Sequence, residues 1–504
     1  MTTTIRRLLV GLALAATASG ARADQATRTE RDLLGEKQVP ADAYYGVQTA
    51  RALENFQISG VTIGEFPEFV QALALVKIAA ARANAEAGTL DPATRDAIER
   101  AAREIADGRH HEQFRVDWFQ GGAGTSTNMN INEVIANVAL ERMGKPRGDY
   151  ATLDPHDHVN LSQSTNDSYP TSLKVAFLLR NDGLVAEVQA LADAFRRKGA
   201  EYLTVLKMGR TEMQDAVPMT VGQELHAFAA GLESEIAFLR LAEQGLYTIN
   251  MGGTAIGTRL NAAPGFPAKT AAQLAALTGK PIVAAQDLIA ATWDLQAFLN
   301  YSSALRSLAV KLSKIASDLI LLSSGPRAGL GELELPPMQP GSSIMPGKVN
   351  PVMPEMTNLV AFRVIGNDTS VMLAAKSGQL QLNAYEPLVG LAVMESQGLL
   401  VNVMKTLRLR AVDGMTVNEA AVRRHIDQTV GIVTALNPVI GYDRATELAR
   451  EAYDSGKGIL EIVREKQVLT DEQLRGVLDP AKLTGLDPAA YPKPKPVAPA
   501  AAKP

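Results

Sequence analysis

The chain has no cysteine among its 504 residues, which excludes disulfides, thiolate metal sites and cysteine nucleophiles. Aromatic residues make up only 5%, so no stacking platform for nucleobases is indicated. Lysine and arginine (50) are outnumbered by aspartate and glutamate (54), and a net charge of −4 offers no basic face for nucleic acid. The sequence also lacks a Walker-type phosphate loop and a dinucleotide-binding fingerprint.

Metal-binding and hydrolase patterns are equally sparse. His110-His111 and His156-Asp157-His158 have no further cluster to complete a metal site, so solvated loops are the simpler interpretation. No serine and histidine stand out as a nucleophile and its base. We therefore assign no metal site.

The first 23 residues have the pattern of a secretory signal. A basic pair, Arg6-Arg7, precedes an apolar stretch at 8–16 that is too short to span a bilayer. Ala21-Arg22-Ala23 has the form of a cleavage site, so the mature chain is expected to begin at Asp24. We expect a secretory signal of the Sec type, with a periplasmic or secreted product, because the match to a twin-arginine signal is loose.

Apolar residues recur with a helical period through the rest of the chain. The stretches 184–195 and 225–239 show it, and the longest case runs from about Phe298 to Ser324. A segment from Pro387 to about Leu409 is apolar on more than one face, which indicates burial from several sides. These patterns predict a mainly α fold built on a helical bundle, with no membrane span.

Strand signals are few. Residues 57–63 form a weak strand candidate. Thr220-x-x-Gln223 is a capping box with a purely structural role.

Four polar loops precede or open helix-like segments. They span residues 121–128, 162–167, 209–215 and 341–351. One such loop is adequately explained as helix capping. Four loops rich in hydroxyls and amides favour carboxylate or phosphate binding at helix N-termini, and a dicarboxylate needs two such places. The fourth loop carries flanking glycines, two hydroxyls and a lysine, and is suited to move as a lid.

The fourth loop (GSSIMPGKVNP, 341–351) closely resembles the signature of the aspartase/fumarase superfamily, and the resemblance extends over about residues 29–478. Three further stretches resemble the aspartate ammonia-lyase branch more than fumarases: LGEKQVPADAYYG at 34–46, SQSTNDSYP at 162–170 and LLSSGPRAG at 321–329. The resemblance implies a three-domain, mainly helical subunit. It also implies a homotetramer whose central helices form one shared bundle, with active sites built from three subunits.

With this resemblance, the chain is expected to divide into five segments. These are a signal peptide (1–23), an N-terminal domain (24–166), a central long-helix bundle (167–421), a small C-terminal helical domain (422–487) and a disordered Ala/Pro/Lys tail (488–504).

The resemblance also implies a role for each site residue in converting L-aspartate to fumarate and ammonium. Ser342 is the implied base for the Cβ proton, with its alkoxide supported by Lys348 and by backbone amides of the closed loop. The remaining implied ligands are Thr125, Ser164, Thr165 and Ser343 for the β-carboxylate, Thr211, Lys348 and Asn350 for the α-carboxylate, and Asn166 for the amino group. No organic cofactor is implied. A divalent ion activates some relatives, but no site for one is assigned here.

One position departs from the family pattern. Relatives carry His or Gln where this chain has Glu212, and the resemblance places Glu355 close to that position. Either the two carboxyl groups share a proton and favour a substrate ammonium, or Glu212 turns away, pairs with an Arg or Lys such as Arg210, and has no catalytic effect. Two other functions stay open: a fumarate hydratase, and an exported binding or adhesion protein that has lost catalysis. The retained Ser342 argues against the second.

Overall fold

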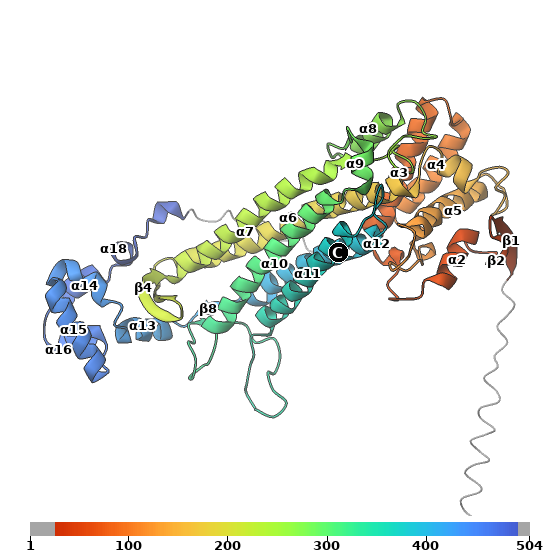
Figure 1. Ribbon diagram of the computed structural model, residues 1–504. Helices are drawn as coiled ribbons and strands as arrows, with labels where there is room; N and C mark the ends of the chain where they lie inside the picture. Colours follow the sequence, from red (N-terminus) through yellow and green to blue (C-terminus); the bar gives the residue numbers. More distant parts are fainter. Residues whose placement is uncertain (1–25, 492–504) are drawn as a thin grey trace, which may run out of the picture. The chain divides into compact units, whose positions relative to one another are not determined.

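The computed structural model describes residues 26–491 (Figure 1). The predicted signal peptide and Asp24 lie outside the described residues, as do residues 492–504. The chain divides into two compact units. Unit 1 comprises the residues up to Leu173 together with Ile249–Thr292, and unit 2 comprises Lys174–Thr248 and the residues from Trp293 onward. The three-domain boundaries given above stay predictions.

Unit 1 is mainly helical. Its elements in chain order are β1 (Thr27–Asp32), β2 (Gly35–Pro40), α2 (Val47–Asn55), η1 (Ile63–Glu65), α3 (Pro67–Glu86), α4 (Pro92–Ala106), η2 (His111–Gln113), α5 (Thr125–Arg142), η3 (Pro155–Val159), the start of α6 (Thr165–Glu201), the end of β5 (Thr248–Ile249), α8 (Phe266–Thr278), β6 (Val283–Ala284) and most of α9 (Leu288–Trp293).

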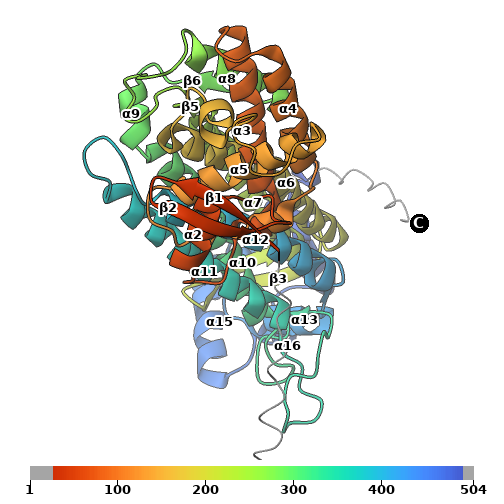
Figure 2. The same ribbon diagram turned by 90° about the vertical axis from the view of Figure 1, so that its right-hand side faces the viewer.

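The core of unit 1 forms around α3 and α5. Helix α3 packs against α4 and α8, and α5 packs against α2 and α4. The antiparallel β1–β2 hairpin lies beside α2, as Figure 2 shows.

Glu133 of α5 fixes the start of α2 from outside that helix. Its carboxyl accepts hydrogen bonds from the backbone amides of Gly46, Gln48 and Thr49 and from the Thr49 hydroxyl. Because Gly46 offers no capping side chain, the buried carboxyl satisfies amides that the helix itself leaves unpaired.

Unit 2 holds the long helices. Its elements are the rest of α6, β3 (Leu206–Thr211), β4 (Gln214–Thr220), α7 (Val221–Glu243), η4 (Gln244–Tyr247), α10 (Gln296–Leu322), β7 (Leu333–Glu334), α11 (Val352–Lys376), α12 (Glu386–Leu407), η5 (Arg408–Val412), β8 (Thr416–Val417), α13 (Glu419–Gln428), α14 (Val433–Ile440), α15 (Tyr442–Ser455), α16 (Ile459–Glu465), α17 (Asp471–Val477), α18 (Pro480–Thr484) and η6 (Pro488–Ala490).

Helices α10, α11 and α12 lie side by side, and α7 packs on α10 (Figure 1). The stripe predicted between about Phe298 and Ser324 is α10, with its apolar positions buried. The mainly helical fold class is thereby confirmed, as is the capping box at Thr220 and Gln223. After the bundle, helices α13 to α17 enclose a second apolar cluster around Ile432, Leu448 and Leu460.

One described helix, Glu386–Val412, is long and apolar enough to cross a membrane by composition alone. The share of its most apolar window buried within the protein is 61%, because α12 packs along α11 and touches α10. It is therefore a core helix of the bundle, as its apolar faces predict.

Two local expectations are wrong. Residues 57–63 form no strand, and only Thr62 makes an isolated bridge, with Asp117. The disordered tail predicted at 488–504 begins too far toward the N-terminus. Pro488–Ala490 form a 3-10 turn, and the Tyr491 ring lies 4.8 Å from that of His226.

Candidate functional site

The first and second polar loops meet in unit 1. The first ends at Gly124, which adopts a left-handed φ of 90° as the N-cap of α5. A Cβ at Gly124 would lie 2.4 Å from the Tyr169 ring, so only glycine lets these segments approach. The N-termini of α5 and α6, with Thr125 and Thr165, are thus brought together.

The second loop is held in shape by a buried carboxyl, Asp167. Its oxygens accept hydrogen bonds from the amides of Ser164, Gly252 and Thr254. Burial raises the pKa of Asp167 to about 6, although these amides oppose the shift. The loop that carries Ser164, Thr165 and Asn166 is therefore tied to residues 252–254.

The hydrogen bonds that the side chains of this loop already make determine which of their groups remain free to donate or to accept. The Asn166 Nδ2 donates to the carbonyl of Ala255 at 2.7 Å, which leaves its Oδ1 available to accept from an ammonium group. Thr165 Oγ1 accepts from Asn128 Nδ2 at 3.2 Å, which leaves the hydroxyl proton available for a carboxylate. Thr125 differs, because its hydroxyl already donates to the carbonyl of Gly122 at 2.7 Å.

The third loop, in unit 2, is a β-hairpin rather than the helix-preceding loop expected. Strands β3 and β4 pair in antiparallel register, with Thr211 opposite Gln214. Glu212 and Met213 form the turn with φ values of 51° and 66°. Left-handed backbone costs an L-residue about 1 kcal/mol, and such strain is common at functional sites.

Arg210 does not pair with Glu212. It reaches Glu332 at 2.6 Å, and Glu332 also contacts Lys207 at 3.1 Å and His425 at 2.9 Å. The proposed pairing of Arg210 with Glu212 is therefore wrong. Within residues 26–491 of this single chain, no hydrogen bond or ion pair joins Glu212 to Glu355 either, and that pairing stays a prediction.

The fourth loop is closed at its base. The Gly341 amide donates to the Lys348 carbonyl at 2.7 Å, and Asn350 Nδ2 donates to the Gly341 carbonyl at 2.8 Å. A Cβ at position 341 would lie 2.8 Å from both partners' backbone atoms, so glycine is required. Asn350 keeps one N–H for a ligand.

Ser342 occupies a distinctive place in this loop. Its Oγ accepts hydrogen bonds from the amides of Ile344 at 3.1 Å and Met345 at 2.9 Å. Two backbone N–H groups aimed at one hydroxyl oxygen stabilise negative charge on it. Ser343 and Lys348 are exposed beside it.

Exposed apolar side chains also mark this loop. Ile344, Met345 and Val349 are 84%, 50% and 52% exposed. The loop projects beyond the ends of α10 and α11 (Figure 1). Exposed apolar side chains on an otherwise polar loop indicate a surface that is covered when the loop closes or when subunits assemble.

Two buried groups behind the loops were not predicted: Lys77 of α3, and Glu332. Lys77 contacts Asn128 and residues of the second loop. Its signal was present in the sequence, because a single lysine interrupts the apolar run from Ala72 to Ala81. Glu332 had no such signal, since it lies in a short loop of ordinary composition.

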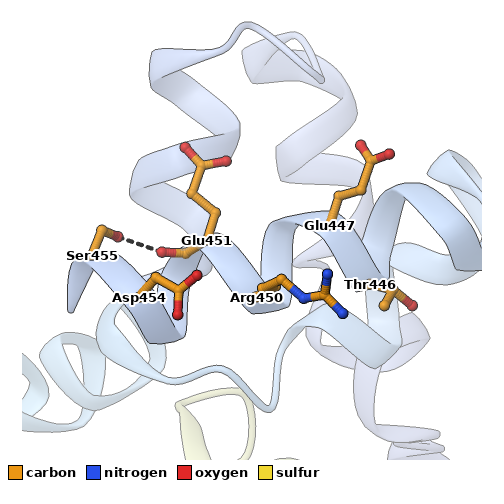
Figure 3. Close-up of a pocket in the computed structure, with 6 residues that line it drawn as sticks. All are labelled: Thr446, Glu447, Arg450, Glu451, Asp454 and Ser455. Atoms are coloured by element: carbon orange, nitrogen blue, oxygen red, sulfur yellow. Dashed lines mark hydrogen bonds between the residues drawn. The ribbon is translucent and has the colours of Figure 1, made fainter.

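A cavity of about 470 Å³ outside these loops runs along α15 (Figure 3). Its lining residues all come from that one helix: Thr446, Glu447, Arg450, Glu451, Asp454 and Ser455. It contains none of the predicted site residues. Within the described part of the chain, no group of three or more His, Asp or Glu side chains is arranged for a metal ion.

Family models match most of the chain. The lyase model matches residues 35–366, and the model of the fumarase C C-terminus matches residues 432–485. An aspartate ammonia-lyase of Pseudomonas fluorescens is 54% identical over 457 residues, covering 90% of this chain and 96% of the relative. That of Escherichia coli K12 is 49% identical over 448 residues, covering 89% and 94%.

Solved structures give the same family. A fumarate lyase:delta crystallin from Brucella melitensis bound to cobalt is 51% identical, with a TM-score of 0.88 over 90% of this chain and 99% of that one. A class II fumarase from Schistosoma mansoni is 34% identical, with a TM-score of 0.85 over 91% and 99%. The chain therefore belongs to the lyase family of the aspartase/fumarase superfamily, in its aspartate ammonia-lyase branch.

Proposed function

We propose that this chain eliminates ammonia from L-aspartate to give fumarate. The proposal rests on the hydrogen bonds of Ser342 inside the family's signature loop. Its Oγ accepts hydrogen bonds from two backbone amides. A serine hydroxyl is a poor base, but amides that stabilise its alkoxide lower the pKa of the hydroxyl.

The reaction begins with removal of a weakly acidic proton. The Ser342 alkoxide takes the Cβ proton of aspartate, and the electron pair of the broken C–H bond moves into the β-carboxylate. The resulting aci-carboxylate dianion carries more charge than the substrate. Hydroxyl donors such as Thr165 therefore bind the transition state more tightly than the ground state.

The second step breaks the bond between Cα and nitrogen. The electron pair of the dianion forms the double bond of fumarate, and the amino group leaves as ammonia. Asn166 supports this step, because its Nδ2 is committed to Ala255 and its Oδ1 accepts from the ammonium group. Thr211, Lys348 and Asn350 are proposed to bind the α-carboxylate, and Ser164 and Ser343 to join Thr165 at the β-carboxylate. Thr125 is proposed to join them when its hydroxyl turns from the Gly122 carbonyl to the substrate.

The elimination is redox-neutral and its charge resides in the substrate carboxylate, so we assign no organic cofactor. Activation by a divalent ion stays a prediction without a site.

We also propose that the active form is a homotetramer. Helices α7, α10 and α11 carry apolar side chains exposed in the single chain: Phe238, Leu241, Val310, Leu359, Phe362, Met372 and Leu373. A cavity of about 480 Å³ between α7 and α10 is lined by Phe228, Val310 and Ile315 among others. Bundle helices with open apolar faces of this kind are covered by neighbouring subunits.

Export is proposed on the sequence of residues 1–23 alone. Mass spectrometry of the protein from expressing cells tests it. A periplasmic chain that starts at or near Asp24 supports export, and an intact Met1 terminus in the cytoplasm contradicts it.

One experiment distinguishes the proposed activity from a fumarate hydratase and from a binding protein. The purified protein is given fumarate with and without ammonium, and the ultraviolet absorbance of fumarate is followed. An aspartate ammonia-lyase consumes fumarate only when ammonium is present, and yields aspartate. Consumption without ammonium, with malate as product, would identify a fumarate hydratase. No consumption in either condition by a folded tetramer would favour a binding protein.

A further inference from the structure

Lys77 lies beneath the first and second loops with no exposed surface. Its Nζ is 2.7 Å from Asn128 Oδ1, 2.8 Å from Gln163 Oε1 and 3.1 Å from Asn160 Oδ1. An ammonium group has three protons and no acceptor, so each proton has one oxygen partner. Burial lowers the pKa of Lys77 to about 7, while nearby Asp167 opposes the shift.

The contact with Lys77 sets the orientation of the Asn128 amide. Three oxygens surround Nζ, as the protonated form of Lys77 requires. Because an ammonium group can only donate, the atom of Asn128 that faces it must be the oxygen, Oδ1. The nitrogen, Nδ2, then points to Thr165 Oγ1 at 3.2 Å and to Asn160 Oδ1 at 3.1 Å. Ser168 Oγ, 3.0 Å from Asn128 Oδ1, is a further donor on the oxygen side.

The orientation of Asn128 in turn sets the polarity of Thr165. Since Thr165 Oγ1 accepts from Nδ2, its own proton has no role in that contact. We propose that Lys77 is a positioning residue of the elimination, which acts through Asn128 to hold the Thr165 hydroxyl as a hydrogen-bond donor toward the substrate carboxylate. This inference rests on the proposed function and on the place of Thr165 in it.

A purely structural role for Lys77 makes a different prediction. In that case Lys77 only joins α3 to α5 and to residues 160–163, and any loss of activity follows loss of folded protein. We call the proposed chain of hydrogen bonds from Lys77 through Asn128 to Thr165 the relay. The relay requires that activity depend on the N–H donor of the Asn128 side chain, even where the fold is preserved.

Asn128→Asp separates the two cases. The new carboxylate still accepts from Lys77, now with opposite charge, so the fold is retained. It has no N–H to donate, and the Thr165 hydroxyl then donates to it instead of to the substrate. Because losing one donor to a developing oxyanion costs about 100-fold in kcat, we expect a fall of that order, with KM for aspartate changed only a few-fold.

Asn137→Asp is the matched control, since Asn137 is an equally buried residue of α5 that bonds to Tyr44 and Tyr150 and to neither loop. It should alter the melting temperature, with kcat within a few-fold of wild type. A second variant, Lys77→Met, removes the donors but keeps a chain of similar length. It frees the Asn128 amide to turn, and a smaller fall in kcat of about 10-fold is expected.

A double-mutant cycle with Thr165→Val gives a readout that a structural role would not change. In the Thr165→Val background, neither Asn128→Asp nor Lys77→Met should lower kcat further by more than about 2-fold. If their effects multiply, or if folded Asn128→Asp keeps at least half of the wild-type kcat, the relay is refuted. Should Asn128→Asp fail to fold, the cycle with Lys77→Met decides by the same criterion.

Failure of the proposed function is recognised separately. A wild-type protein without ammonium-dependent consumption of fumarate refutes the function itself. An active wild type whose Thr165→Val variant is equally active removes Thr165 from the site, and the relay with it.

Discussion

Glu332 holds Arg210 at 2.6 Å, one residue before Thr211 at the turn of the β3–β4 hairpin. Glu332 is 1% exposed and also contacts Lys207 of β3 and His425 of α13. Burial alone would raise the pKa of Glu332, but Lys207 and Arg210 hold it below its ordinary value. One carboxylate therefore fixes a proposed substrate-binding hairpin to the start of β7 and to α13.

Glu332→Gln should loosen this hairpin. It leaves Arg210 without its counter-charge, whereas Lys207 keeps Glu224 at 2.6 Å. Removing one partner of a buried ion pair costs about 3 kcal/mol or more. KM for aspartate should rise with it, because Thr211 is no longer held. Chemical denaturation measures the stability and steady-state kinetics measure KM, with Glu334→Gln at the exposed neighbouring position as control.

Since the pKa of Glu332 is depressed in the fold, the stability difference between wild type and Glu332→Gln should be present above pH 4.5 and shrink as pH falls below it. A difference independent of pH would contradict this account.

Ser342→Ala should bind aspartate with nearly the wild-type KM and lose at least about 1,000-fold in kcat, because the loss falls on the transition state. Ser455→Ala removes an exposed hydroxyl that donates to the Glu451 carbonyl and accepts from the Lys457 amide, and it should leave kcat unchanged. Retention of more than about a tenth of the wild-type kcat by Ser342→Ala would remove Ser342 from the role of base.

Glu133 should make stability depend on pH. Burial raises its pKa from 4.5 to about 7, against the amides of Gly46 and Gln48. The folded state then binds more protons than the unfolded state between these values, so unfolding free energy falls as pH rises from 4.5 to 7. Glu133→Gln removes this dependence, and the difference between the two curves should reach about 3 kcal/mol.

The control for Glu133 lies on the same helix. The hydrogen bond from Tyr44 lowers the pKa of Glu141, so Glu141→Gln should give a difference of opposite sign, lost as pH falls below 4.5. If the Glu133→Gln difference is flat across pH 4 to 8, Glu133 keeps an ordinary pKa in the fold.

Glu212→Gln should stay active, because it restores a residue found in relatives. If Glu212 and Glu355 share a proton across the assembled site, the profile of kcat/KM against pH should lose or shift one limb. The preference for aspartate over malate should also narrow. If the variant matches the wild type in both the pH profile of kcat/KM and the preference for aspartate over malate, Glu212 takes no part in substrate selection or catalysis.

Association should control activity if the site is shared between subunits. Dilution or mild denaturant should reduce specific activity in parallel with the tetramer fraction measured by sedimentation. A fully active monomer would contradict the shared site.

The bundle could be predicted because its period is uninterrupted. The stretch from Phe298 to Ser324 contains no glycine or proline, and its apolar stripe is long enough to identify α10. The hairpin at Thr211 could not be predicted, because its turn is Glu212-Met213 and lacks the Asn-Gly or Asp-Gly signal of such turns.

The candidate site residues in the four loops could be named from the sequence because the resemblance to the family assigns their positions. The groups that orient them could not. Lys77, Asn128 and Thr165 are far apart in sequence, and their relation depends on how α3, α5 and α6 pack. The two hydrogen bonds that Ser342 Oγ accepts from backbone amides are likewise visible in the structure and not in the sequence.

The central claim is tested most directly by incubating the purified chain with L-aspartate, and separately with L-malate, and measuring fumarate and ammonium together. The account predicts fumarate and ammonium in equal amounts from L-aspartate, with both absent when Ser342→Ala replaces the wild type. Fumarate formed from malate, with no ammonium released from aspartate, would contradict it.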